Sequence, residues 1–249
     1  MNVRRTLIAV SLAGLLPVAA SAQALPDGAA LVAKHMAAMG GRDAMDKHSS
    51  LHITGTFSMA AMGIEGPVHL YRAKPAKFLQ QITIGSFGEA VQGYDGTTAW
   101  AVQPGQGAII LSGEMFEQAK SQGDFFADFP DVSKYSKIET IALEDFEGRK
   151  CYKVKLLKAV GGETIQYFDA ETGLAAGAIR STETQMGKME VTVVLADYKE
   201  QGGVKMPTRV VQKTPQGDIA LTFSTYEWDK VEPAIFDLPA DVKAMVKPY

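Results

Sequence analysis

The sequence predicts a mainly β protein with a few helices, in which antiparallel strands form an up-and-down meander that curls into a barrel or half-barrel. Two observations predict this class. Most of the chain alternates apolar and polar residues with a period of two, which is the pattern of half-buried strands. Short turn sequences such as Asp95-Gly96, Gly161-Gly162 and Gly202-Gly203 separate the alternating segments. Connections this short join antiparallel neighbours, because parallel strands need crossovers of a dozen or more residues.

The first residues of the chain have the features of a removable export signal. Arg4 and Arg5 precede an apolar run from Leu7 to Val18, and the small-residue sequence Ala20-Ser21-Ala22 follows that run. A basic start, a short apolar run and a small-x-small cleavage site are typical of secretory signal peptides. We therefore expect residues 1–22 to be a signal peptide and the mature chain to reach the periplasm.

The mature chain, residues 23–249, is expected to form a single domain. Without Arg4 and Arg5 it has 23 basic and 28 acidic residues, a net charge of −5. This acidic balance, with no clustered basic face, disfavours binding of nucleic acid. Cys151 is the only cysteine and lies far from the cleavage site, so we expect neither a lipidated cysteine there nor an internal disulfide. The expected protein is soluble and makes only transient membrane contact.

A helix is predicted first, followed by a change of period. Val32, Met36 and Met39 recur at helical spacing, so a helix is predicted over 32–39, and Gly40-Gly41 supplies a left-handed stop. From Leu51 onward the period is two, which predicts a strand whose two faces differ in polarity. Apolar Leu51, Ile53, Phe57 and Met59 alternate there with polar His52, Thr54, Thr56 and Ser58.

The same alternation predicts the strands that follow. Residues 112–120 break the pattern and are predicted as a short helix, which leads into an aromatic segment at 125–130. Val242, Met245 and Val246 have i, i+3 and i+4 spacing, so a short final helix is predicted after Pro239. The further predicted strands cover 68–73, 77–84, 88–93, 98–102, 108–111, 137–143, 150–157, 163–168, 178–184, 188–198, 206–213 and 218–226.

The sequence contains no recognisable catalytic or metal-binding pattern. His35, His48, His52 and His69 form no HExxH motif, and no GxSxG nucleophile turn occurs. Gly105-Gln106-Gly107 lacks the third glycine of a dinucleotide-binding turn. Most carboxylates fall in predicted turns, where solvation explains them. We predict a protein that is not an enzyme, with no catalytic residue, no metal and no cofactor. A cofactor-free hydrolase that uses paired carboxylates is a further interpretation, after the two non-catalytic ones given below.

A single curved sheet would display many apolar side chains on its concave side. A closed eight-stranded barrel fills itself with such residues, whereas a larger or open one leaves a cavity. Since monomers rarely leave a large apolar surface in water, we expect this face to be lidded, occupied or paired with a partner. The helix over 32–39 and the aromatic segment are the predicted lids. The predicted ligand-binding residues of the cavity and lid are Ile53, Phe57, Met59, Phe78, Ile82, Ile84, Trp100, Met115, Phe116, Phe125, Phe126, Phe129, Met189, Val191, Val193, Leu221 and Phe223.

Four motifs in a fixed order resemble those of one group of envelope proteins. They are GYDGTTAW at 93–100, YFDAETGL at 167–174, GVKMPT at 203–208 and FDLP at 236–239. After a signal peptide and a helix that ends at Gly40-Gly41, this order is similar to that of the outer-membrane lipoprotein-sorting protein family, the LolA-like superfamily of periplasmic carriers. The resemblance covers nearly the whole mature chain.

The resemblance implies an incomplete antiparallel β-barrel, or half-barrel, lidded by short helices and holding the acyl chains of lipids or lipoproteins. Well-studied carriers of this family have a single gating arginine. Arg42, Arg72 and Arg180 are the candidates for it here, and the motifs do not decide among them. Lipid acyl chains or an acylated lipoprotein are the implied partners, with an envelope protein as a further one.

The leading prediction is a soluble periplasmic carrier for a hydrophobic, acylated ligand. Complete burial of two sixteen-carbon chains would release on the order of 25 kcal/mol. Noncovalent complexes saturate at roughly 18 to 21 kcal/mol, so a working carrier is expected to bury such chains only partly. The alternative prediction is a non-catalytic envelope sensing or protein-interaction module, whose apolar residues interlock in a solid core.

Overall fold

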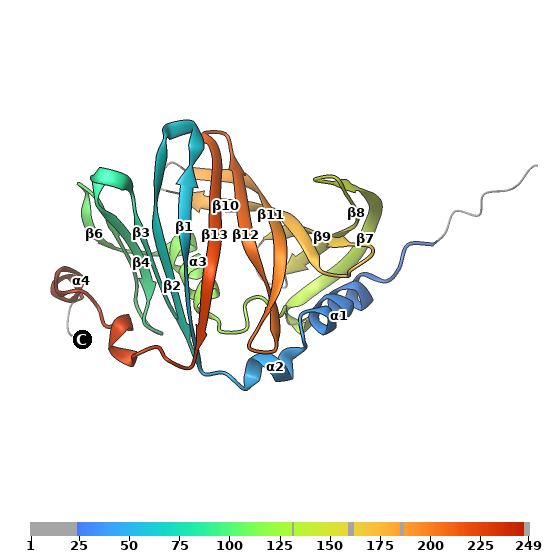
Figure 1. Ribbon diagram of the computed structural model, residues 1–249, viewed down its shortest axis with the longest axis horizontal. Helices are drawn as coiled ribbons and strands as arrows, with labels where there is room; N and C mark the ends of the chain where they lie inside the picture. The colour runs from blue at the N-terminus through green and yellow to red at the C-terminus, as the bar shows by residue number, and fades with distance from the viewer. Residues whose placement is uncertain (1–23, 131, 159–161, 185–186, 247–249) are drawn as a thin grey trace, which may run out of the picture.

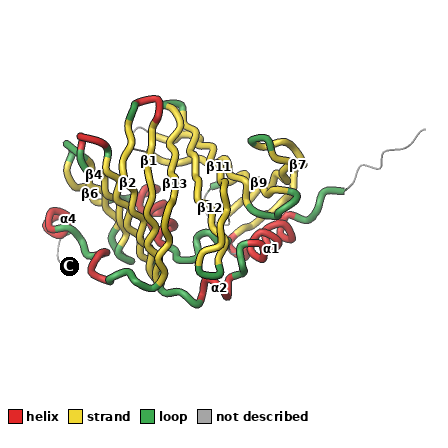
Figure 2. Tube along the Cα trace, in the orientation of Figure 1, coloured by secondary structure: helices red, strands yellow, loops and turns green. Residues whose placement is uncertain are grey.

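The computed structural model describes residues 24–246, apart from residue 131, residues 159–161 and residues 185–186 (Figure 1). The predicted signal peptide at 1–22 lies outside the described residues and stays a prediction. Thirteen antiparallel strands form one continuous sheet that curves around a concave side (Figure 2). The predicted mainly β, antiparallel half-barrel is thereby confirmed. In the described part of the chain, no helix has both the length and the apolar character that a bilayer span requires.

All thirteen predicted strands are present, and most extend a few residues beyond the predicted limits. Their bounds are β1 Ser50–Met59, β2 Ile64–Ala73, β3 Lys77–Thr83, β4 Glu89–Tyr94, β5 Ala99–Gln103, β6 Gly107–Ile110, β7 Tyr135–Phe146, β8 Arg149–Lys158, β9 Glu163–Asp169, β10 Ala175–Thr184, β11 Gly187–Gln201, β12 Val204–Thr214 and β13 Gly217–Trp228.

The order of the strands departs from a simple meander at one point. Strands β1 to β6 are neighbours in chain order, and so are β7 to β13, but β1 pairs with β13 while β6 and β7 form the two edges of the sheet. The pairing of β1 with β13 is antiparallel and includes Leu51 opposite Trp228 and Phe57 opposite Leu221. The chain passes from β6 to β7 through a helical segment at 113–123, which covers part of the concave face. Because β6 and β7 do not pair with each other, the sheet stays open.

Four helices flank the sheet within the described residues: α1 Gly28–Ala38, α2 Arg42–Asp46, α3 Gly113–Gly123 and α4 Ala240–Met245. The three predicted helices are confirmed, and the five-residue α2 was not predicted. The side chain of Asp27 caps α1 by accepting a hydrogen bond from the Ala30 N–H at 2.9 Å. Gly40 ends α1 with a φ of 108°, where an added Cβ would lie 2.4 Å from the carbonyl oxygen of Gly203. Glycine is required there by both the backbone angle and the close approach.

The two faces of the sheet are packed by different segments. On the concave face, α3 covers Phe78 and Tyr94, while Phe125 packs against Leu51 and Ile53. On the convex face, the C-terminal segment with α4 packs against the outward side chains of β3 and β5. The alternation predicted for β1 is confirmed, because its apolar residues point inward and its polar residues outward.

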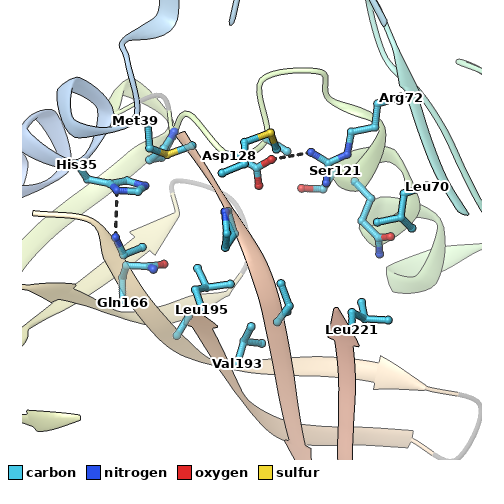
Figure 3. A pocket seen from close by; sticks show the side chains of 18 of the residues that line it. His35, Met39, Leu70, Arg72, Ser121, Asp128, Gln166, Val193, Leu195 and Leu221 are labelled. Atoms are coloured by element: carbon cyan, nitrogen blue, oxygen red, sulfur yellow. Dashed lines mark hydrogen bonds and ion pairs between the residues drawn. The ribbon is translucent and has the colours of Figure 1, made fainter. Parts of the chain in front are cut away.

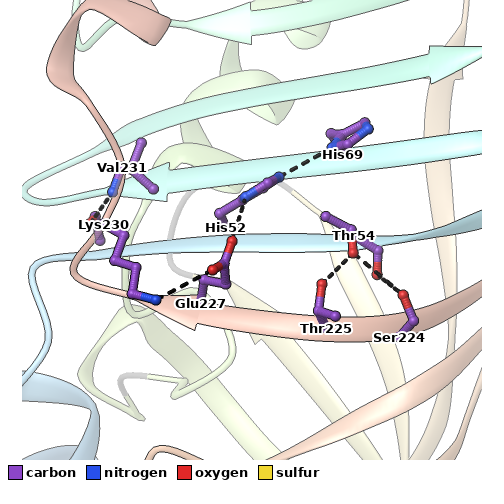
Figure 4. A network of polar contacts seen from close by, with 9 residues as sticks. His52, Thr54, His69, Ser224, Thr225, Glu227, Lys230 and Val231 are labelled. Atoms are coloured by element: carbon purple, nitrogen blue, oxygen red, sulfur yellow. Dashed lines mark hydrogen bonds and ion pairs between the residues drawn. The ribbon is translucent and has the colours of Figure 1, made fainter.

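A polar cluster occupies the convex face over β1, β2 and β13 (Figure 4). The Nε2 atom of His52 lies 3.1 Å from Nδ1 of His69, and the His52 Nδ1 atom lies 3.4 Å from a carboxylate oxygen of Glu227. Burial, followed by the neighbouring His69, lowers the pKa of His52. Within the described ranges, no three His, Cys, Asp or Glu side chains come together in a way that could hold a metal ion.

Candidate ligand-binding cavity

A cavity of about 420 Å³ lies between the concave face of the sheet and residues 121–130 (Figure 3). Its walls come from both halves of the sheet, namely β1 to β3 and β7 to β13, and His35 of α1 and the following Met39 contribute to one end. Its size falls within the range of small-molecule pockets, roughly 300 to 1,000 Å³. Because the cavity is open to solvent, a ligand has a route into it.

Five of the predicted binding residues line this cavity. Strand alternation explains them, since each is an inward-pointing residue of β1, β3, β11 or β13, and these strands lie on opposite sides of the hollow. That they contact a ligand stays a prediction. The five residues are Ile53, Phe78, Val193, Leu221 and Phe223.

The neighbouring part of the concave face is filled by its own side chains. Phe57 and Leu221 are opposite each other on β1 and β13, and both are buried in a cluster with Val68. Met59 and Ile82 pack against the same cluster. The prediction placed all of these residues on the concave side correctly, but Phe57, Met59 and Ile82 do not line the cavity, because they interlock with one another.

Trp100 is a correction to the predicted binding residues, since it points to the convex face. It is fully buried against Leu79, Phe236 and Val242. The small inward residues that flank it on β5 leave room for α3 on the concave side, and the C-terminal segment covers the large ring on the other. The GYDGTTAW segment also allows this packing, because Gly93 has no side chain where the indole of Trp100 lies across the strand pair.

Met115 and Phe116 are a second correction. Both belong to α3 and pack with Tyr94 and Leu111 between that helix and the sheet, so they fix the helix in place and do not line the cavity. Tyr94 and Phe116 meet edge to face with ring centroids 5.9 Å apart. The sequence predicted a short helix over 112–120, but it did not indicate whether the apolar face of that helix packs on the sheet or lines a cavity.

The three predicted lid residues of the aromatic segment take two different positions. Phe125 is completely buried in the core beside Leu51. Phe126 and Phe129 line a neighbouring pocket that shares Ser121, Ala127, Pro130 and Tyr135 with the cavity. The remaining predicted residues, Ile84, Met189 and Val191, also lie outside the cavity lining.

An ion pair connects the covering segment to the sheet. Arg72 of β2 donates a hydrogen bond from Nη1 to Oδ2 of Asp128 at 2.7 Å, and both residues line the cavity. Arg42, by contrast, lies over the Phe126 ring at 4.0 Å from its centroid, outside the main cavity. Of the three candidate arginines, Arg72 is therefore the one that is ion-paired with the cover. No local sequence signal indicates this contact, because its partners are far apart in the chain.

The polar groups at the α1 end of the cavity are neutral and mostly hydrogen-bonded. Nδ1 of His35 accepts a hydrogen bond from the Ala175 N–H at 3.1 Å, and burial lowers the pKa of His35 to about 4, although the Asp128 charge opposes this. The hydroxyls of Tyr198 and Tyr226 donate to the carbonyl oxygens of Ala175 and Pro207. Burial first, and the Asp128 charge second, raise the pKa of both tyrosines.

The described lining has one histidine, His35, and its hydrogen bond is to the backbone. His35 is buried without a hydrogen-bonded hydroxyl or thiol nucleophile among the described lining residues. Cys151 lies on the convex side in a separate apolar cluster, and burial raises the pKa of its thiol to about 11, which disfavours the reactive thiolate. The arrangement is suited to holding an apolar molecule beside a few fixed polar groups.

The strands and the segments that flank them define an open antiparallel half-barrel with a covered cavity. A scan of protein-family models and a search of curated proteins return no match. Solved structures do match the fold. A LolA superfamily protein from Nitrosomonas europaea is 13% identical with a TM-score of 0.56, over 86% of this chain and 99% of that one. A DUF1329 family protein from Desulfovibrio piger is 12% identical with a TM-score of 0.57, over 86% and 98%.

A third similar structure is a domain named for outer membrane lipoprotein sorting, from Vibrio parahaemolyticus. It is 12% identical with a TM-score of 0.52, over 84% of this chain and 96% of that domain. The predicted resemblance is therefore confirmed at the level of the fold, which this chain shares with the three structures along most of its length.

Proposed function

We propose that the chain is a non-catalytic carrier that holds the acyl chain of a lipid or of an acylated lipoprotein in the cavity. The single observation that carries the proposal is the hollow between the sheet and its cover. Apolar side chains such as Ile53, Val193 and Phe223 converge on it, and the cover is a separate segment held by Phe125 in the core and by the ion pair of Asp128 with Arg72. A ligand could enter through the open side of the hollow, and a movement of the cover would widen that route without unfolding the sheet.

The partial filling of the concave face fits reversible binding. Phe57 and its neighbours occupy one part, so only a portion of a long alkyl chain would be enclosed. About ten buried methylenes supply roughly 8 kcal/mol at 0.8 kcal/mol each. That value corresponds to roughly micromolar affinity before the costs of association are subtracted. Affinity of this order allows both uptake and release.

We propose that the protein acts in the periplasm, with lipid or acylated lipoprotein as its cargo. The export-signal pattern at the start of the chain supports this location. The fold shared with a domain named for lipoprotein sorting supports this class of cargo. An envelope protein that delivers or receives the cargo would be the further partner.

The alternative function is a non-catalytic sensing or protein-interaction module. The observation that favours it is the interlocked cluster of Phe57, Val68 and Leu221, which shows that part of the concave face is a solid core. In this alternative, the remaining hollow would have no physiological ligand and the outer loops would bind a protein partner.

Lipid binding is tested on the mature protein purified from its native envelope. We expect organic extraction and mass spectrometry to recover about one acylated molecule for each chain. The emptied protein should then bind a fluorescent fatty acid at micromolar concentration. If extraction yields no lipid and the probe does not bind, the carrier function is wrong and the interaction module is favoured.

A pair of matched variants places the binding in this cavity. Ala178 lines the cavity on β10, whereas Ala220 of β13 is half-buried and does not line it. Ala178→Phe should fill the hollow and weaken probe binding on the order of tenfold or more, because the alkyl chain and the new ring compete for one volume. Ala220→Phe should bind like the wild type. Equal binding by both variants would place the lipid elsewhere.

A further inference from the structure

One charged side chain in the cavity has no partner. Arg180 of β10 lines the cavity, and it makes no hydrogen bond or ion pair with the residues that the structure describes. The other lining arginine, Arg72, is paired with Asp128. Arginine stays protonated in proteins, so an unpaired guanidinium in an apolar wall is a fixed positive charge.

The charges of the cavity do not balance. Arg72, Asp128 and Arg180 are the charged side chains among its described lining residues, and His35 is neutral at pH 7 because its pKa is about 4. Two positive charges and one negative charge leave the lining with a net charge of +1. A purely neutral alkyl ligand would leave this charge uncompensated.

The sheet register keeps Arg180 away from the carboxylate of Asp128. Asp128 is ion-paired with Arg72, which lies opposite Leu51 at the end of the sheet where β1 begins and β13 ends. Arg180 lies five positions beyond Ala175, the first residue of β10, on the order of 16 Å at about 3.3 Å per residue. It is opposite Val191, close to the end of the sheet where β12 and β13 are joined. The positive charge and the ion-paired cover are thus at different ends of the cavity.

The surroundings of Arg180 favour pairing with an anion. Desolvation lowers the pKa of its guanidinium, although the residue as a whole is exposed. The opposite residue Val191 is buried and apolar. The side chain is nevertheless reached from the solvent, so it lies in the open part of the concavity. An anionic group could contact it there while an attached chain extends deeper.

We propose that the cavity's ligand carries one anionic group, a carboxylate or a phosphate ester, which pairs with Arg180 while its alkyl chain lies along the apolar wall. This inference rests on the proposed carrier function and narrows it to anionic lipids such as fatty acids or lipid phosphates. The chain would run from Arg180 toward the α1 end, where the lining includes Phe168 and Leu156. A guanidinium binds both classes of anion in a bidentate manner.

The test compares a pyrene-labelled fatty acid with its methyl ester, which has the same chain without the charge. The wild type should bind the ionised acid on the order of tenfold more tightly, the size expected for a charge-assisted hydrogen bond. Arg180→Gln should lose this preference, because its affinity for the acid falls while its affinity for the ester stays the same. Unchanged ester binding shows that the variant is folded. Arg180→Lys should keep most of the preference, and Arg209→Gln, which alters an arginine outside the cavity, should keep all of it.

The outcomes separate this inference from the carrier function. If the acid and the ester bind equally well to the wild type, or Arg180→Gln keeps the preference, the anionic subsite is wrong and the carrier survives. If neither probe binds, the carrier function fails and the subsite with it. A further arm adds inorganic phosphate at constant ionic strength. If the wild type still prefers the acid to the ester, the site holds a lipid head group. If millimolar phosphate removes this preference, the site holds a small free anion and the proposal is overturned.

Discussion

The protonation state of His35 affects the stability of the folded chain. Its ring is 5% exposed, lies 5.4 Å from the Phe168 ring and accepts the Ala175 N–H. Protonation would remove this acceptor and place a charge in an apolar site. The pKa of His35 in the folded protein is therefore about 4, below the ordinary value of 6.5.

This depressed pKa predicts a loss of stability in mild acid. Between about pH 6.5 and pH 4 the unfolded chain binds a proton at His35 that the folded chain does not, so the free energy of unfolding falls as pH falls. The contribution is on the order of 3 kcal/mol. His35→Gln keeps an acceptor for Ala175 and should show a flatter profile. Urea denaturation across this window checks it, and parallel profiles for the two proteins would contradict it.

The titration of Asp229 does not affect the urea denaturation measurement on His35, because Asp229 takes up its proton at lower pH. Desolvation alone raises the pKa of Asp229, but hydrogen bonds from the Ser49 N–H, from His48 and from the Ser49 hydroxyl lower it to about 2. A lowered carboxyl pKa contributes stability above the ordinary value of 3.8 and loses it as pH falls toward 2. Its effect is small, since the side chain is 43% exposed and well screened.

At the scale of elements, the covering segment at residues 121–130 is held to the sheet by apolar and ionic contacts. Phe125 anchors it in the core, and the ion pair between Arg72 and Asp128 fixes its inner side. Asp128→Asn should speed the release of an uncharged pyrene ester about fivefold, because a partly exposed ion pair contributes roughly 1 kcal/mol. Stopped-flow displacement measures this rate. The ester is used because the substitution also changes the charge of the cavity.

The matched control for that prediction is Lys134→Gln. Lys134 is ion-paired with Asp124 of the same segment at 3.4 Å, but it does not line the cavity, and its side chain is 65% exposed. Release from this variant should equal release from the wild type. A similar acceleration in both variants would mean that any loss of charge loosens the segment, and that the pair with Arg72 has no special role in closing it.

The elements were predictable from the sequence to the extent that local patterns define them. Alternation in β1 identified its inward and outward residues, and Gly40 marked the end of α1. Alternation does not say which face is concave, so Trp100 was placed on the wrong side. The pairing of β1 with β13 and the contact of Arg72 with Asp128 join distant parts of the chain, and such contacts leave no periodic trace.

At the scale of the whole molecule, the concave face combines a packed region with a hollow. Phe57 and Val68 meet as a core does, whereas Val193, Leu221 and Phe223 line an open volume. The packed region and the covered convex face supply the stability of the sheet. The hollow adds none, because lining atoms without neighbours lose dispersion contacts. A protein that keeps such a hollow gives up stability that a filled core would have.

Because the hollow lowers stability, Ala178→Phe is predicted to affect stability and ligand binding in opposite directions. In an emptied carrier, Ala178→Phe places a ring in unoccupied space and should raise the free energy of unfolding by about 1 to 2 kcal/mol, near the value of burying a phenyl group. If the interior were already filled, the same ring would overpack it and lower stability by roughly 1 to 3 kcal/mol. Calorimetry on lipid-free protein distinguishes the two signs. If Ala178→Phe is more stable and also binds the probe more weakly, the ring occupies the space that the ligand needs. Stability and function then compete for one volume.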